Sequence, residues 1–207
     1  MKKLLKYLLI IFVALNLLII ISGKSWMYKA ISITYLKGHQ SSYIHDFIHF
    51  PANTIQVSEH QEWATADNYN KAQLPEFIKP INENLETVAF MVIINDSIQY
   101  EEYWHGYSAD TMSNSFSMSK SWVSTLIGIA LTEGKIKSVD EKVCDFLPNF
   151  CEGRNTELTI KDLLTMSSGL NWIEDYYNPI GQTAESYYGK HLSELVNNLK
   201  VIETPGK

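Results

Sequence analysis

A serine and a lysine three residues apart, Ser117 and Lys120, have the types and the spacing of a nucleophile and its base. On a helix, residues three apart lie on one face with Cβ atoms about 5–6 Å apart, so the amine can reach the hydroxyl. A serine hydroxyl is a weak nucleophile until a neighbouring group takes its proton, and a lysine can take it only when neutral. Burial favours a neutral lysine. The pair therefore predicts a serine that attacks a carbonyl carbon.

The residues after Lys120 are expected to form the helix that positions this pair. The stretch WVSTLIGIAL, residues 122–131, is apolar on nearly every side, and such a helix is normally buried. Ser117 would then stand in the first turn, where unpaired N–H groups and the helix dipole favour a developing oxyanion. Its own N–H is the natural first donor, and Gly134 suits the left-handed end of the helix.

A purely structural interpretation of the same residues is also open. Serine often caps a helix by accepting hydrogen bonds from first-turn N–H groups, which would account for Ser117 and Ser119. Lys120 would then be an ordinary solvated charge. An apolar run that follows the lysine almost at once makes a solvated position less comfortable.

Two blocks of the chain resemble a known family. FSMSKSWVSTLIGIALTEGKIKSVDEKVCDFLP and LTIKDLLTMSSGLNW are similar to the serine β-lactamase and penicillin-binding-protein superfamily. Within it they are closest to the class C-like branch of esterases and 6-aminohexanoate-oligomer hydrolases. The resemblance runs from about Thr87 to Pro205. It implies an α+β fold of the β-lactamase/DD-peptidase type, an antiparallel sheet with a helical domain, in which Ser117 forms an acyl-enzyme and Lys120 is its general base.

The resemblance also implies a substrate class. It favours a small amide, an ester or a peptide-like molecule over β-lactams, with no metal and no organic cofactor. In the nylon-oligomer hydrolases a tyrosine after a similar Glu-Asp pair contacts the substrate, and Tyr176 matches that position; packing of Tyr176 against the core is an equally open interpretation. The alternatives to a hydrolase are a penicillin-binding or sensor module that is acylated without turnover, and an inactive fragment.

The sequence stops before two motifs that relatives carry. They continue through a Pro-Gly turn into a Y-x-N or Y-x-S motif and later a K-T-G or H-T-G strand, and neither follows Pro205-Gly206 here. We therefore expect the C-terminal half of the fold to be missing and the sequence to be part of a longer protein.

Residues 1–21 combine a basic start with an apolar run broken only by Asn16. The run is intermediate between a signal-peptide core and a full span of about 20 residues. No small-x-small cleavage site is clear around Ser22, so an uncleaved signal anchor in the inner membrane is favoured over a cleaved signal peptide. The first lysines would stay cytoplasmic, and the catalytic domain would face the periplasm or the cell exterior.

Three segments follow from these observations: a signal anchor at 1–23, an extended arm or linker at 24–80, and the N-terminal part of the hydrolase domain at 81–207. The net charge of −6 argues against a nucleic-acid partner, and no strong basic run indicates a second membrane contact. The arm contains histidines without a recognisable ligand spacing, which we interpret as surface residues and not as metal ligands: His39, His45, His49 and His60.

Local patterns predict further elements. Residues 86–103 are typical of two strands joined at Asn95-Asp96, and His105 beyond them is expected at the surface. Thr159 and Asp162 resemble a capping box that begins a helix closed by Gly169.

The two cysteines, Cys144 and Cys151, flank the loop DFLPNF. In a reducing compartment they would be buried thiols. Beyond a membrane segment, two cysteines so close together are typical of a disulfide, which would add about 2–3 kcal/mol of stability in the chain-entropy model.

Overall fold

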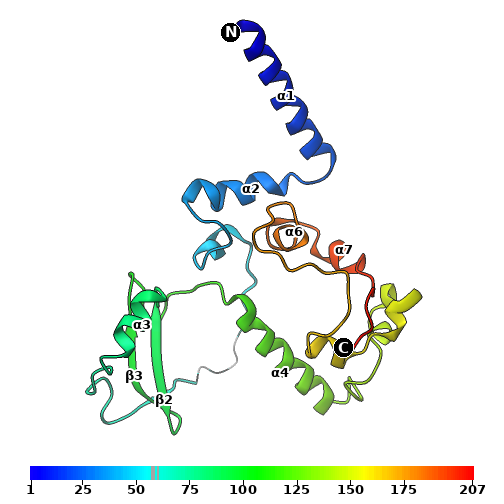
Figure 1. Cartoon of the computed structure of the whole chain (residues 1–207). Coiled ribbons are helices and arrows are strands. Elements are labelled where there is room, and N and C mark those ends of the chain that lie inside the picture. The colour runs from blue at the N-terminus through cyan, green and yellow to red at the C-terminus, as the bar shows by residue number, and fades with distance from the viewer. Residues whose placement is uncertain (57–58, 60) are drawn as a thin grey trace. The chain divides into compact units, whose positions relative to one another are not determined.

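The computed structural model describes residues 1–56, 59 and 61–207, and it mixes helices with a small sheet (Figure 1). His60 lies outside the described residues. The α-helices are α1 (Lys2–Ile21), α2 (Trp26–Ile33), α3 (Ile78–Asn84), α4 (Ser119–Thr132), α5 (Ile160–Leu164), α6 (Gln182–Tyr188) and α7 (Leu192–Asn197). The strands are β1 (Ala64–Thr65), β2 (Ala89–Ile94) and β3 (Ser97–Tyr103). The 3₁₀ turns are η1 (Tyr35–Lys37), η2 (Asp46–His49), η3 (Phe116–Met118), η4 (Val143–Asp145), η5 (Pro148–Phe150) and η6 (Gly153–Glu157).

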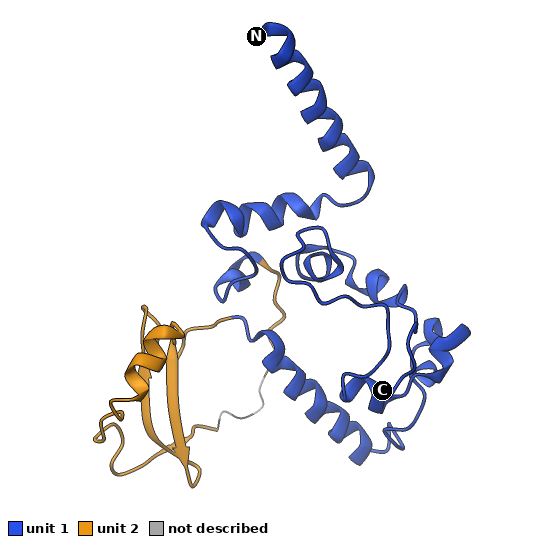
Figure 2. Ribbon diagram, in the orientation of Figure 1, with its two compact units in different colours: residues 1–49, 114–207 blue, residues 50–113 orange. Residues whose placement is uncertain are grey.

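The chain forms two compact units (Figure 2). Unit 1 consists of residues 1–49 and 114–207, and unit 2 of residues 50–113. The predicted boundaries at residues 23 and 80 stay a prediction. Helix α2 was not expected inside the arm predicted at 24–80, because two helical turns are too short to show a periodicity. Its Trp26, Ala30 and Ile33 are buried in unit 1.

Unit 2 is built on the expected hairpin. Strands β2 and β3 pair antiparallel, and β1 adds to β3 in parallel, which gives the order β1-β3-β2. Asn95 and Asp96 both have positive φ, 50° and 58°, which is the requirement of the tight hairpin turn whose twist matches that of the strands. The predicted strand pair is thus confirmed, with a two-residue turn. His105, just beyond β3, is exposed as expected.

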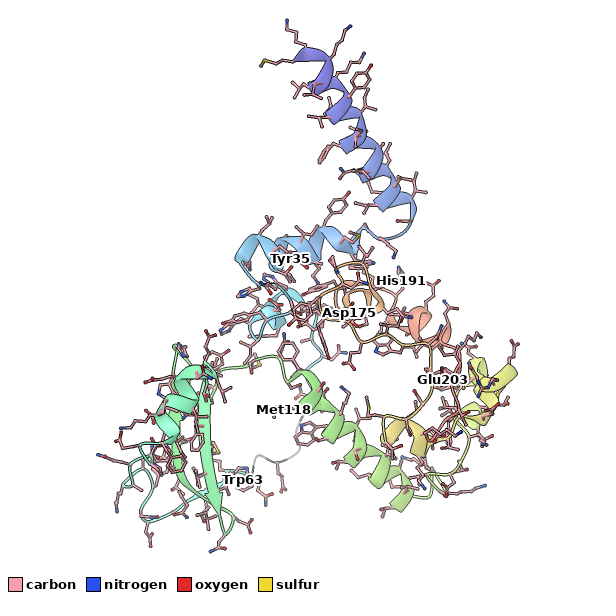
Figure 3. All side chains as sticks on the ribbon, viewed as in Figure 1. Tyr35, Trp63, Met118, Asp175, His191 and Glu203 are labelled. Carbon is pink, nitrogen blue, oxygen red and sulfur yellow. A yellow bond between two sulfur atoms is a disulfide. The ribbon has the colours of Figure 1, made fainter. Side chains whose placement is uncertain are left out.

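Helix α1 is the one helix, within the described part of the chain, that is long and apolar enough to cross a membrane. None of its residues is buried, and its side chains project on all sides (Figure 3). A signal sequence near the N-terminus has the same length and composition, so α1 fits either an anchor or a signal sequence.

The core of unit 1 lies between the segments 143–158 and 199–201. Val143, Phe150, Leu158 and Val201 form its apolar cluster, and Leu158 is fully buried. Asn155, only 1% exposed, donates its side-chain N–H to the Leu199 carbonyl at 3.0 Å and accepts from the Val201 N–H at 2.7 Å. One buried amide therefore holds two segments that are more than forty residues apart in sequence.

Helix α5 begins as predicted and ends early. Thr159 and Asp162 form the reciprocal capping box. The helix ends at Leu164 and not before Gly169, because Met166 takes a left-handed conformation with φ 59°. Gly169 still has a special role: its φ is 65°, and a Cβ atom there would lie 2.5 Å from the Glu203 carbonyl oxygen. Only glycine fits this close approach without strain.

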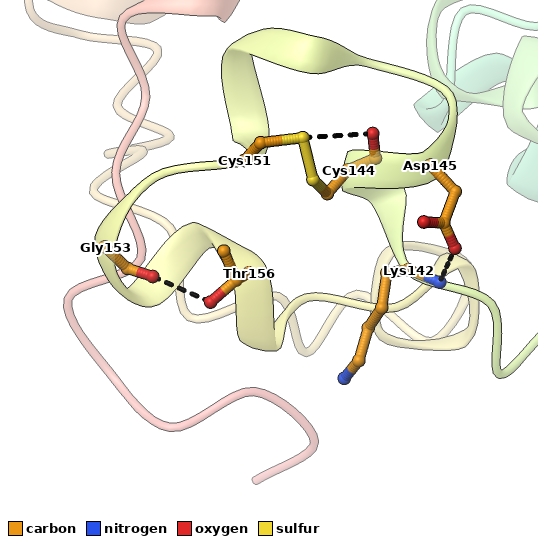
Figure 4. The surroundings of a disulfide bond; sticks show 6 residues. All are labelled: Lys142, Cys144, Asp145, Cys151, Gly153 and Thr156. Carbon is orange, nitrogen blue, oxygen red and sulfur yellow. Dashed lines mark hydrogen bonds between the residues drawn. A yellow bond between two sulfur atoms is a disulfide. The ribbon is translucent and has the colours of Figure 1, made fainter.

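The Cys144 and Cys151 sulfur atoms form a disulfide in unit 1 (Figure 4). The two Cα atoms are 4.8 Å apart, and the bridge closes the loop that contains η5. That loop supplies the buried Phe150, so the bridge constrains a segment of the core.

The expectation that α4 is buried is wrong for this structure. No residue of α4 is buried, and Trp122 is 74% exposed. A pocket of about 860 Å³ separates its Val123 and Ile127 from Ile136 and Ile160, so that face is not close-packed. The apolar pattern correctly predicts a helix that requires covering, but the described residues supply little of it. Gly134 ends the helix with φ 70°, as predicted.

Candidate active site

The predicted nucleophile and base meet at the start of α4. Ser117 lies in η3, directly before the helix and not in its first turn, and Lys120 lies in the first turn. The Lys120 Nζ donates to the Ser117 Oγ at 2.7 Å. The N-cap residue of α4 is Met118, without a side-chain hydrogen bond, so Ser117 is not a cap of this helix. Both side chains are exposed.

The residue before Ser117 has an unusual backbone. Phe116 has φ 44°, a left-handed conformation that is rare for a bulky side chain and strains the chain. Such strain collects at functional sites, where the surroundings hold it in place. The Phe116 ring stacks on Tyr187 with centroids 6.3 Å apart, and the Ser119 hydroxyl donates to the Phe116 carbonyl at 2.7 Å. The stacking on Tyr187 supports the backbone next to Ser117.

A pocket of about 880 Å³ opens over Ser117 and Lys120. Its lining comes from residues 30–42, 116–120 and 172–192, all in unit 1. Tyr35 lies in η1, just after α2, and Asp175 lies in the loop before α6 (Figure 3). Among the described residues, the charged side chains of the lining are Lys120 and Glu174, and the aromatic ones are Tyr35, Phe116, Trp172, Tyr176, Tyr187 and Tyr188. This volume, with aromatic rings and many hydroxyl and amide groups in its wall, suits a small organic ligand that has both apolar and polar parts.

Asn114 joins the N-terminal wall of the pocket to the segment that carries Ser117. Its N–H donates to the Ile44 carbonyl at 2.9 Å, and its side-chain amide donates to the Tyr43 carbonyl at 3.0 Å. The same amide donates to the Tyr187 hydroxyl at 2.6 Å. Burial raises the pKa of Tyr187 to about 12, and the nearby Asp46 carboxylate adds to this shift. Tyr187 is therefore neutral at physiological pH.

Tyr176 lines this pocket, about half exposed. Its hydroxyl donates to the Glu174 carboxylate, and this hydrogen bond raises the pKa of Tyr176 above its ordinary value. Tyr176 is therefore not packed into the core, and it lines the same pocket as Ser117.

The histidines of the N-terminal segment take part in other contacts. His39 stacks on Tyr43 with centroids 4.0 Å apart, and the His49 Nε2 lies 2.9 Å from the Lys37 Nζ. Over residues 1–56, 59 and 61–207, no group of three His, Cys, Asp or Glu side chains is arranged to hold a metal ion.

Comparison with known proteins shows the family of this chain. The β-lactamase family model matches residues 74–207, about two thirds of the chain. The chain belongs to the β-lactamase family. The match covers η3, α4 and the tyrosine-rich loop, so Ser117, Lys120 and Tyr176 lie within the family domain. The expected β-lactamase-like fold with mixed helices and strands is confirmed.

Two similar proteins carry related names. The 6-aminohexanoate-dimer hydrolase of Paenarthrobacter ureafaciens is 26% identical over 110 residues, which are 53% of this chain and 28% of that protein. A structure from Bacillus anthracis, provisionally named a 6-aminohexanoate-dimer hydrolase, superposes with a TM-score of 0.58 at 17% identity and shares the fold. That match covers 71% of this chain and 44% of the other. This β-lactamase-family chain thus spans less than half of either relative.

Sequence reasoning missed part of the pocket. Tyr35 and the residues Gln40–Ser42 lie in the segment predicted as an arm and precede the region that the family model matches. Long-range contacts hold this segment in place, such as those of α2 with α6 and of Asn114 with the Tyr43 and Ile44 carbonyls, and the local sequence gives no signal for them. Tyr187, another lining residue, lies eleven residues after the predicted Tyr176 and was not singled out from the sequence.

Proposed function

We propose that this chain is the N-terminal part of a serine hydrolase that cleaves an amide or an ester through an acyl-enzyme. The observation that supports it most strongly is the 2.7 Å hydrogen bond between the Lys120 Nζ and the Ser117 Oγ, at the floor of a ligand-sized pocket. Membership of the β-lactamase family supports a hydrolase. The 6-aminohexanoate-dimer hydrolases among its relatives favour a small amide as the substrate.

In the proposed mechanism the Ser117 Oγ attacks the carbonyl carbon of the substrate while a neutral Lys120 amine takes the hydroxyl proton. The carbonyl π-electrons move to oxygen, and the Ser117 N–H helps to hold the oxyanion. As the tetrahedral intermediate collapses, the bond to the leaving group breaks, and Lys120 returns the proton to that amine or alcohol. In the second half, Lys120 takes a proton from water while the water oxygen attacks the acyl carbon. The bond to the Ser117 Oγ then breaks, Lys120 returns the proton to that oxygen, and the acid is released.

The exposed position of Lys120 bears on this mechanism. Removal of water from an amine favours its neutral form, and the described residues leave the Lys120 side chain exposed. Covering of α4 would both bury its apolar side chains and remove water from the amine. We therefore expect full activity only where Trp122 and Leu126, now 74% and 61% exposed, are covered.

Labelling by a fluorophosphonate probe tests the proposed nucleophile. We expect the whole protein to be labelled and Ser117→Ala to lose labelling completely, because the probe forms a covalent bond only with an activated serine. Ser119→Ala is the matched control, since Ser119 lies two residues away and its hydroxyl donates to a backbone carbonyl. Undiminished labelling of Ser117→Ala would place the nucleophile elsewhere.

Tyr176→Phe tests the proposed substrate contact. The change removes the hydroxyl that donates to Glu174 and keeps the ring. We expect KM for a small amide to rise several-fold, because a typical hydrogen bond contributes about 0.5–1.5 kcal/mol. Tyr177→Phe, a 76% exposed neighbour, is the control. An unchanged amidase and esterase rate in Tyr176→Phe would refute the contact.

We also propose the location of this hydrolase. Helix α1 would remain as an anchor in the inner membrane, with the lysines before it on the cytoplasmic side. The unit that carries Ser117 would then face the periplasm or the cell exterior. The disulfide between Cys144 and Cys151 is compatible with that oxidising side.

A further inference from the structure

Helix α2 and the turn η1 have an inward face and an outward face. The inward face consists of the buried Trp26, Ala30 and Ile33, and α2 contacts α6. The outward face, which we call the α2 surface, consists of Tyr28, Ile31 and Leu36, which are 39–78% exposed. On a helix, Tyr28 and Ile31 lie opposite the inward face, because successive residues are rotated by about 100°. Large apolar side chains therefore gather on a side that no described element covers.

The α2 surface is tied closely to the apolar helix α1. Ile21 ends α1 and Trp26 begins α2, and a chain of this length spans at most about 18 Å. The Tyr28 hydroxyl donates to the Asn16 Oδ1 at 2.6 Å. Asn16 lies five residues before the end of α1, about 8 Å along its axis. Tyr28 therefore reaches the level of the last turns of α1, where the membrane interface lies if α1 spans the bilayer.

The charge of this region fits an anionic lipid surface. Asp46 is the first acidic residue of the whole sequence, whereas Lys24, Lys29 and Lys37 lie within or beside α2 and η1. The complete chain carries a net charge of −6, so the N-terminal segment is the basic part of an acidic protein. Lysines next to exposed tyrosine and aliphatic side chains are the composition of interfacial helices. They are spread along the segment, so no basic run reveals them in the sequence.

We propose that the α2 surface docks on the anionic phospholipid bilayer that α1 enters. The apolar side chains enter the headgroup boundary, and the positive charges of the lysines are attracted to the lipid phosphates. The docking is a second membrane contact, beyond the anchor, and it does not depend on hydrolysis. Because Tyr35, which follows α2 in η1, lines the pocket over Ser117, a docked chain holds that pocket beside the bilayer. If the proposed hydrolase function holds, amphiphilic esters or amides in the bilayer are its substrate class.

Fluorescence quenching in the whole protein, reconstituted in vesicles, tests the docking. An environment-sensitive label on Ser32→Cys, an exposed position of α2, reports on the α2 surface, and the same label on Lys137→Cys, exposed after α4, is the control. Both are made in the Ser117→Ala background, so the result is independent of catalysis. With nitroxide-bearing lipids and anionic phosphatidylglycerol, we expect several-fold stronger quenching at residue 32 than at residue 137. Equal quenching at the two positions would overturn the proposal.

Charge reversal separates the docking surface from the anchor alone. Lys29→Glu with Lys37→Glu should remove most of the quenching at residue 32, while Lys135→Glu with Lys200→Glu, two exposed lysines of the same unit, should preserve it. Undiminished quenching after the first reversal would overturn the anionic-lipid docking.

Hydrolysis by the protein with Ser117 intact tests delivery of the substrate from the bilayer. Lys29→Glu with Lys37→Glu should slow hydrolysis of an ester held in vesicles and leave hydrolysis of a dispersed short-chain ester unchanged. Equal slowing of both reactions would refute delivery from the bilayer. An inactive wild type would refute only the hydrolase function.

Discussion

Replacement of Lys120 by methionine should lower the rate of Ser117 acylation by about 10²–10⁴, the usual contribution of a positioned general base. Methionine keeps an unbranched side chain of similar length but has no amine to accept the proton of the Ser117 hydroxyl, which now lies 2.7 Å from the Lys120 Nζ. The second-order rate of fluorophosphonate labelling of the whole protein measures this effect without knowledge of the substrate.

A second variant separates base catalysis from simple electrostatics. Lys120→Arg keeps the positive charge and the length, but an arginine does not lose its proton in proteins. If Lys120 is the base, Lys120→Arg should be about as slow as Lys120→Met. A labelling rate in Lys120→Met within about threefold of wild type, with an unchanged melting temperature, would show that Ser117 is activated by another group.

Asn155→Ala should reduce the free energy of unfolding by about 2–4 kcal/mol, because it leaves a buried carbonyl and a buried N–H without partners. These groups belong to Leu199 and Val201, which the Asn155 amide now bonds at 3.0 and 2.7 Å. Since a domain is stable by only about 5–15 kcal/mol, the loss should lower the midpoint of urea unfolding clearly. The unfolding of unit 1, followed by circular dichroism, measures it.

The neighbouring residue is the matched control for that variant. Thr156 is exposed, and its hydroxyl donates to the Gly153 carbonyl at 2.8 Å. Thr156→Ala should change the unfolding free energy by no more than about 0.5 kcal/mol, as surface substitutions usually do. Equal effects of the two substitutions would mean that the Asn155 amide does not hold the segment 199–201 in place.

The features that could be predicted from the sequence depend on neighbours in the chain. The spacing of Ser117 and Lys120 predicts a contact because one helical turn brings them together, and the capping box at Thr159 depends on bonds over three residues. The hairpin turn at Asn95-Asp96 depends likewise on local backbone preferences. In each case the decisive interaction is short-range, so the pattern of residues contains it.

The features that could not be predicted depend on distant partners or on their absence. Tyr35 lines the pocket because long-range contacts, among them those of α2 with α6, hold the N-terminal segment against the rest of unit 1, and no periodicity encodes such contacts. Trp122 was expected to be buried and is exposed. An apolar side chain indicates that a covering partner is required, but it does not indicate that the described residues supply that partner.

The most direct measurement of the central claim is peptide mass mapping of the whole protein after reaction with a fluorophosphonate probe. We predict a single adduct on the peptide that contains Ser117, absent from Ser117→Ala and present in Ser119→Ala. An adduct on Ser119 or on another residue, or no adduct at all on a folded protein, would contradict the assignment of Ser117 as the nucleophile of a serine hydrolase.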